Sequence, residues 1–174
     1  AKLTGRRYNV VDYIGDKNAK YVIVSMGSSC DTVEETLAFL PKGVGLIRVH
    51  LFNPLPVKAF LAALPKSVEQ IAVLDRTKEA GSVGEPLYQN VRSIVDSKIS
   101  VFGGRYGLGS KEFKPRDVKA IVEYMMRGTL HHNFTVGIDD DLTHLSLDTD
   151  KTFTIENSDV KTAILYGIGS DGTV

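Results

Sequence analysis

Three glycines near the end of the sequence have a spacing that could hold a phosphate group. Gly167, Gly169 and Gly172 follow a G-x-G-x-x-G pattern directly after an apolar, strand-like run. Glycine lets backbone N–H groups approach an anion closely, and such loops bind phosphate where a helix begins. A dinucleotide site would also need that helix and an acidic residue about 20 positions further on, and neither follows in the sequence. The glycine pattern alone is therefore weak evidence for a binding site.

Charged residues also occur in two other predicted loops, which contain glycine and, in the first of them, proline. In "DRTKEAGSVGEP", Arg76, Lys78 and Glu79 could grip an anionic substrate. The alternative is a network of ion pairs at a surface or at a domain contact, because most exposed ion pairs are structural. In "GGRYGLGS", Arg105 could reach a phosphate or a carboxylate, or it could pack against a neighbouring domain.

The residue types that usually carry catalysis or bind metals do not form a pattern. Cys30 is the only cysteine, so it can neither form an internal disulfide nor bind a metal cluster alone, and it lacks an identifiable histidine partner. His131 and His132 are adjacent and on a strand would point to opposite faces. The three aspartates at 139–141 lack the glycine and glutamate of a calcium loop. We therefore predict no catalytic residue and no metal site, and a structural role for Cys30.

Strands and helices alternate from about residue 20 to 138. Continuous apolar runs of strand length are typical of parallel strands that are buried on both faces. The pattern predicts an α/β fold of three layers, with a mostly parallel sheet and helices on both faces. Ligands of such sheets gather at loops that follow the strands, here 27–30, 52–56, 75–86 and 103–110. The predicted strands are 20–27, 44–52, 70–75, 98–104 and 133–138, and the predicted helices are 28–41 and segments that begin after Pro56, Pro86 and Pro115.

Composition excludes several classes of function. Lysine and arginine total 21, as do aspartate and glutamate, so no net charge attracts nucleic acid or anionic lipid. No apolar run approaches the roughly 20 residues of a membrane helix. The region after residue 139 is polar and reads as an extended connection, and a new strand, "TAILYG", begins near its end. We therefore place a domain boundary near residues 150–160.

Five stretches together resemble one enzyme family. "LTGRRYNVVDYIGDKNAKYVIVSMGSSCDTVEE" is followed by "IAVLDRTKEAGSVGEPLY", "GGRYGLGSKEF", "NFTVGIDDDLTHLSL" and "YGIGSDGTV". In this order they resemble an internal segment of pyruvate:ferredoxin (flavodoxin) oxidoreductase, also called pyruvate synthase. The resemblance covers essentially the whole chain. It rests mainly on the second and third stretches, which are far more specific than a glycine motif.

The resemblance implies a domain organisation. Residues 1–19 would be an N-terminal connecting segment, and 20–150 a domain like the C-terminal domain of transketolase. Residues 151–174 would be a linker and the truncated start of a coenzyme A-associated domain. Gly169, Ser170, Asp171, Gly172 and Thr173 would then be candidate coenzyme A or phosphate contacts.

The resemblance also implies a function for the parent protein. It would oxidatively decarboxylate pyruvate with coenzyme A to acetyl-CoA and CO₂, and pass electrons to ferredoxin or flavodoxin. Thiamine diphosphate, Mg and 4Fe-4S clusters would belong to other domains, so we expect no cofactor in this segment. Its role would be structural, with the other domains of the polypeptide and a homodimer partner as its contacts. The single cysteine suggests a cytoplasmic protein, or one in an organelle for a eukaryotic source.

Two alternatives stay open. Asn53 stands where we expect an arginine in bacterial members, which leaves the corresponding non-catalytic domain of a sulfite reductase flavoprotein subunit or of a pyruvate:NADP oxidoreductase. The chain could also be a stand-alone module that binds phosphate or nucleotides.

Overall fold

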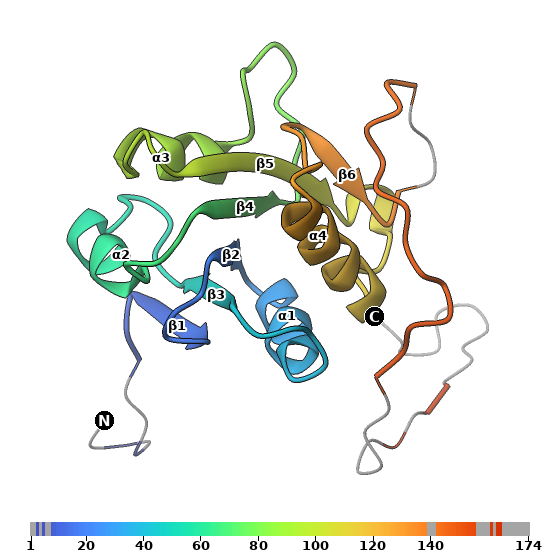
Figure 1. Ribbon diagram of the computed structural model, residues 1–174, viewed down its shortest axis with the longest axis horizontal. Helices are drawn as coiled ribbons and strands as arrows, with labels where there is room; N and C mark the ends of the chain where they lie inside the picture. The colour runs from blue at the N-terminus through green and yellow to red at the C-terminus, as the bar shows by residue number, and fades with distance from the viewer. Residues whose placement is uncertain are drawn as a thin grey trace, which may run out of the picture.

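A six-stranded sheet forms the centre of the protein (Figure 1). The computed structural model describes residues 3, 5, 8–138, 142–155, 161, 163 and 164. Its elements in chain order are β1 (Val11–Gly15), β2 (Tyr21–Met26), α1 (Ser29–Leu37), β3 (Val44–Val49), α2 (Val57–Ala63), β4 (Gln70–Asp75), α3 (Pro86–Ile94), β5 (Ser100–Tyr106), the 3₁₀ turn η1 (Leu108–Ser110), α4 (Pro115–Arg127) and β6 (Phe134–Val136).

The sheet is parallel except at one edge. Its strand order is β1-β3-β2-β4-β5-β6, and β2 to β6 all run in the same direction. The chain adds β3 on one side of β2 and then crosses to the other side for β4. Strand β1 is antiparallel to β3, with Val11 opposite Val49 and Gly15 opposite Gly45. The predicted mostly parallel α/β sheet is confirmed.

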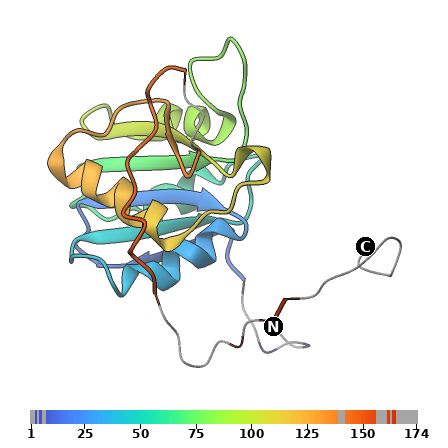
Figure 2. The ribbon, with the colours of Figure 1, turned by 90° about the vertical axis from the view of Figure 1, so that its right-hand side faces the viewer.

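Helices cover both faces of the sheet, as predicted. Helices α1 and α4 lie on one face, and α2 and α3 lie on the other (Figures 1 and 2). Successive side chains of a strand point to opposite faces. In β2, Ile23 therefore packs with α1 and α4, whereas Val22 and Val24 pack on the side of α2 and α3. Burial on both sides explains why the inner strands are continuous apolar runs.

Helix α4 shows how the sequence specifies an element. Pro115 begins it, in the first turn where proline costs no hydrogen bond. Gly128 follows its last residue with φ of 67°, the left-handed conformation that commonly ends a helix. One face of the helix is buried against the sheet through Val118, Ile121, Val122 and Met125. These are the residues whose spacing predicts the helix.

Helix α3 is capped by a residue of the preceding strand. The carboxylate of Asp75, at the end of β4, accepts the backbone N–H groups of Leu87 at 3.0 Å and Tyr88 at 3.1 Å. Asp75 is buried, and burial raises the pKa of its carboxyl group, an effect that the two N–H donors oppose. Asp75 therefore holds the start and the end of the loop between β4 and α3 close together.

Several elements differ from their predicted bounds: α1 ends at Leu37 rather than at residue 41, and β3 ends at Val49 rather than at residue 52. Residues 11–15, which sequence analysis left in a connecting segment, form the edge strand β1. Strand β5 continues through Arg105 and Tyr106, which lie beyond the predicted strand 98–104. Gly104 allows this continuation, because a Cβ atom there would lie 2.0 Å from the ring of Phe134 on the neighbouring strand. The predicted strand "TAILYG" lies outside the described residues except for residues 163 and 164.

Candidate functional site

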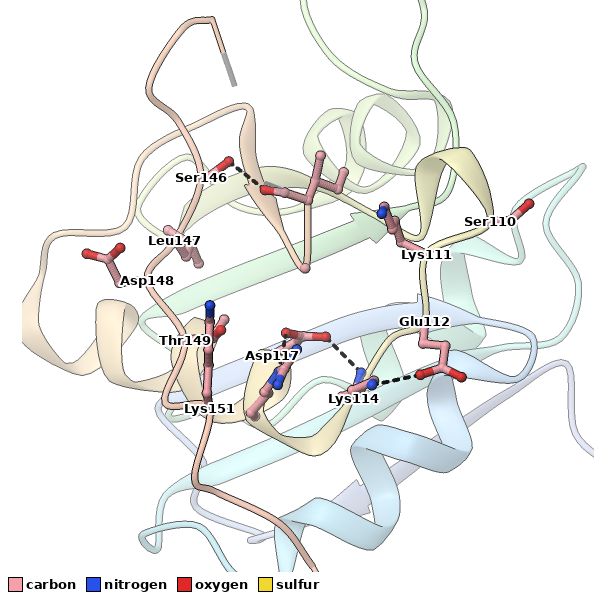
Figure 3. Close-up of a pocket in the computed structure, with 13 residues that line it drawn as sticks. Ser110, Lys111, Glu112, Lys114, Asp117, Ser146, Leu147, Asp148, Thr149 and Lys151 are labelled. Carbon is pink, nitrogen blue, oxygen red and sulfur yellow. Dashed lines mark hydrogen bonds and ion pairs between the residues drawn. The ribbon is translucent and has the colours of Figure 1, made fainter. Parts of the chain in front are cut away.

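A polar cleft of about 800 Å³ opens where β6 ends and α4 begins (Figure 3). Three segments form it: the connection from η1 into α4, the end of β6, and residues 146–151. It lies at the carboxyl ends of the parallel strands, where ligands of such sheets bind. The loop 103–110 that the sequence singles out contributes Ser110 to it.

Basic side chains outnumber acidic ones in the lining of this cleft. Lys111, Lys114, Arg116 and Lys151 all line it, and we call it the basic cleft. Lys114 forms an ion pair of 2.8 Å with Glu112. Neither Lys111 nor Lys151 forms an ion pair within the described part of the chain. Two ammonium groups on opposite sides of the cleft thus have no ion-pair partner among the residues that the structure describes (Figure 3).

Asp117 lies at the floor of the basic cleft and organises the start of α4. Its Oδ2 atom accepts the backbone N–H of Lys114 at 2.8 Å, which closes the first turn of the helix. Gly137 packs directly on this carboxylate, since a Cβ atom there would lie 3.0 Å from Oδ2. Asp117 is buried. Its contacts assign it to the structure of the cleft.

Residues 146–151 form a wall that is fastened to the rest of the domain. The hydroxyl of Ser146 donates to the carbonyl of Ile138 at 3.0 Å, and the N–H of Leu147 donates to the carbonyl of Thr135 at 2.8 Å. Lys119 pairs with Asp150 at 2.8 Å, and the Lys119 side chain holds the pKa of the Asp150 carboxyl well below its usual range. Sequence reasoning predicted an extended connection here but missed its role in the cleft.

A second hollow of about 470 Å³ lies beside the first, between the ends of β2 and β4. This is the point where the strand order reverses, which is the usual ligand position in open α/β sheets. Its lining includes Ser28, Thr32, Arg76 and Tyr106. The Nε atom of Arg76 donates to the carbonyl of Gly107 at 3.1 Å, so this side chain joins the ends of β4 and β5.

Residues 76–85, which we call the arm, rise from the sheet as one long loop (Figures 1 and 2). Arg105 pairs with Glu85 at its base, and Glu85 also accepts the N–H of Glu79 at 2.7 Å. His132 bridges the arm to β5, accepting the N–H of Gly103 at 3.1 Å on Nδ1 and donating from Nε2 to the carbonyl of Val83 at 2.6 Å. The arm is therefore ordered by contacts within the domain.

The structure favours the structural alternative for part of the charged loops. Arg105 bonds within the domain through its pair with Glu85, and Glu79 contributes its backbone N–H to the arm. Arg76 donates from Nε to the carbonyl of Gly107, and its side chain also lines the second hollow. Lys78 is exposed. Of the predicted ligand loops, those after β2, β4 and β5 border the hollows, whereas 52–56 borders neither.

The other sequence candidates are also placed. His131 precedes β6 beside His132, and no group of three His, Cys, Asp or Glu residues that could hold a metal ion occurs among the described residues. No helix within those same residues has the length and apolarity to span a membrane. The aspartates at 139–141 and the candidate contacts Gly169, Ser170, Asp171, Gly172 and Thr173 lie outside the described residues, as do Gly167 and most of the terminal motif.

Cys30 is fully buried in α1, and burial raises the pKa of its thiol to about 11. Because the reactive thiolate is populated only as the pH approaches this raised pKa, we expect no reaction of the folded protein with a thiol-specific disulfide reagent at pH 8. In denaturant, one thiol per chain should react, which gives the matched control. Rapid labelling of the folded protein would contradict the structural role of Cys30.

The fold defines a class: an α/β domain with a mostly parallel sheet that helices cover on both faces. The structure of 2-oxoglutarate:ferredoxin oxidoreductase from Magnetococcus marinus matches 67% of this chain with a TM-score of 0.51 at 19% identity, and the match spans 19% of that chain. At this identity the likeness concerns the fold alone. The family model "Pyruvate:ferredoxin oxidoreductase core domain II" matches residues 19–118. The chain belongs to this family.

The curated relatives that match this chain are much longer proteins. It is 49% identical to pyruvate-flavodoxin oxidoreductase of Rhodospirillum rubrum and 51% identical to pyruvate:ferredoxin oxidoreductase of Moorella thermoacetica, each time over 100% of this chain. It is 44% identical to pyruvate dehydrogenase [NADP(+)] of Cryptosporidium parvum. The chain spans only 16%, 15% and 10% of these three relatives.

Proposed function

We propose that this chain is the second core domain of a pyruvate oxidoreductase. The parent protein would convert pyruvate and coenzyme A to acetyl-CoA and CO₂ and pass the electrons to ferredoxin or flavodoxin. The observation that supports this proposal most strongly is the sequence match. The whole chain, including its motif loops, is 49% and 51% identical to internal segments of two such enzymes. Because the relative from Cryptosporidium parvum is a pyruvate dehydrogenase [NADP(+)], NADP⁺ is a second candidate for the electron acceptor.

The cofactors of the parent would belong to other domains. A 4Fe-4S cluster needs four thiolates, and this chain has one cysteine, which is buried. Thiamine diphosphate and Mg would likewise be bound elsewhere in the polypeptide. Gly169, Ser170, Asp171, Gly172 and Thr173 are the positions we propose for coenzyme A or phosphate contacts.

The role of this domain would be to hold the other domains in place. This is supported by the residues of the specific motifs, which build shape rather than a reaction centre: Asp75 caps α3, and Glu85 and Arg105 order the arm. Such a block would contact other domains of its polypeptide and a homodimer partner. We propose the cytoplasm, or an organelle of a eukaryotic cell, as its location.

A domain exchange tests this proposal. The matching segment of the Moorella thermoacetica enzyme, to which the chain is 51% identical, is replaced by this chain, and pyruvate- and coenzyme A-dependent dye reduction is measured. We expect the exchanged enzyme to keep its thiamine, iron and activity, and the isolated chain to reduce no dye. The control exchange inserts this chain with Arg105→Met, which we expect to loosen the arm and to lower the activity of the exchanged enzyme.

Two results would overturn the proposal. One is turnover of pyruvate by the isolated chain. The other is an exchanged enzyme that retains its cofactors and its oligomeric state but has lost all activity.

A further inference from the structure

We propose that the basic cleft binds a phosphate-bearing small molecule through Lys111, Arg116 and Lys151. The inference goes beyond the structural role proposed above, because it concerns a ligand of this domain itself. It stands on the cleft's volume, on the excess of positive charge among its described lining residues and on the guanidinium group of Arg116.

Among the described residues, the charges that line the cleft do not balance. Among the acidic lining residues, Glu112 is already paired with Lys114, and the carboxylate of Asp148 points away from the cleft (Figure 3). Asp117 is buried at the floor, where it accepts the N–H of Lys114. The ammonium groups of Lys111 and Lys151 therefore remain for a ligand that carries negative charge.

Arg116 adds a third positive charge to the lining. Its side chain is 30% exposed, and its Nε atom forms a long ion pair of 4.0 Å with Oδ1 of Asp117. A guanidinium group has five donors in a fixed fork, a geometry that matches phosphate oxygens.

The cleft is larger than one phosphate group. A volume of about 800 Å³ lies within the range of small-molecule sites, about 300–1,000 Å³. The site also lies at the N-terminal end of the 13-residue helix α4, where the helix dipole favours an anion. A phosphate group that is part of a larger molecule, or a pyrophosphate, fits these features better than a single carboxylate.

Titration of the purified chain tests the inference. We measure binding of pyrophosphate, inorganic phosphate, coenzyme A and acetate by calorimetry, and follow backbone amide NMR signals of residues 110–117 and 146–151. We expect pyrophosphate to shift these signals and acetate to leave them in place. Coenzyme A distinguishes the two sources of the phosphate group. If coenzyme A binds more tightly than pyrophosphate, the ligand is an organic phosphate; if it binds more weakly, the ligand is free phosphate or pyrophosphate.

Charge-removing variants identify the residues. The double variant Lys111→Gln, Lys151→Gln should weaken pyrophosphate binding by about tenfold or more, since two charge-assisted contacts are lost. The matched control is Lys66→Gln, Lys98→Gln, which removes two exposed lysines far from the cleft and should change binding less than about twofold.

Three results would overturn the inference. These are no shift with any phosphate compound, equal loss in the cleft and control variants, or binding of a glutamate-rich peptide where pyrophosphate fails. The last would show that an acidic protein segment occupies the cleft. None of them depends on pyruvate oxidation, so the structural role of the domain would stand.

Discussion

Replacing Arg105 by methionine is expected to lower the free energy of unfolding by about 3–5 kcal/mol. Glu85 has 1% of its surface exposed, and Arg105 is the only cation that pairs with it in the described structure. Without the guanidinium, a carboxylate stays buried with no opposite charge, and that is the costly case for a buried ion pair. The midpoint of urea unfolding measures the effect. Hydrogen exchange of the arm should rise at the same time.

Two further variants distinguish the loss of the Glu85–Arg105 ion pair from a general effect of removing a positive charge. Arg92→Met removes an exposed arginine on α3 and should change stability by less than about 0.5 kcal/mol. The double variant Glu85→Gln, Arg105→Met should be more stable than Arg105→Met alone, because it leaves no buried charge. A single variant as stable as Arg92→Met would contradict the role assigned to the pair.

Phe134→Ala is the second substitution with a large expected effect, a loss of about 3–5 kcal/mol. Its ring is fully buried on β6 and fills the space that Gly104 leaves open on β5. Truncation removes this packing and leaves a cavity that neighbouring strands cannot collapse into. Thermal or urea unfolding measures the loss. The exposed Phe39 gives the matched control, since Phe39→Ala should cost less than about 0.5 kcal/mol.

Gly104→Ala approaches the same contact from the other side. The added methyl group would overlap the buried ring of Phe134, so this variant should also be destabilised, by about 1–3 kcal/mol. Wild-type stability in both Phe134→Ala and Gly104→Ala would show that the two strands do not pack as described.

The inner part of the fold could be predicted from the sequence because burial leaves a clear pattern. "QIAVLD" predicts β4 with its observed bounds, and the apolar spacing after Pro115 predicts α4. Edge elements carry weaker signals. Strand β1 contains the exposed or half-buried Asp12 and Tyr13 and has a neighbour on one side only, so its sequence does not read as a buried run.

The position of the basic cleft at the sheet edge follows from the predicted fold, but its lining could not be predicted from the sequence. Parallel strands place ligands at their carboxyl ends, and the basic cleft opens there. Its wall at 146–151 could not be read from sequence, because the polar residues bond across the fold to β6 and α4. The ion pair of Arg105 could not be predicted from the sequence either, because its partner Glu85 is 20 positions away. The two residues meet only because the arm folds back to the sheet.

The direction of β1 determines how this domain can be joined to others. Because Val11 is opposite Val49, the last residue of β3, the chain enters the sheet from the side where the parallel strands end. A body attached ahead of β1 would thus be tethered on the side of the sheet that bears the arm and the basic cleft. Short tethers give effective concentrations of about millimolar, so contacts too weak to hold separate molecules together would suffice here.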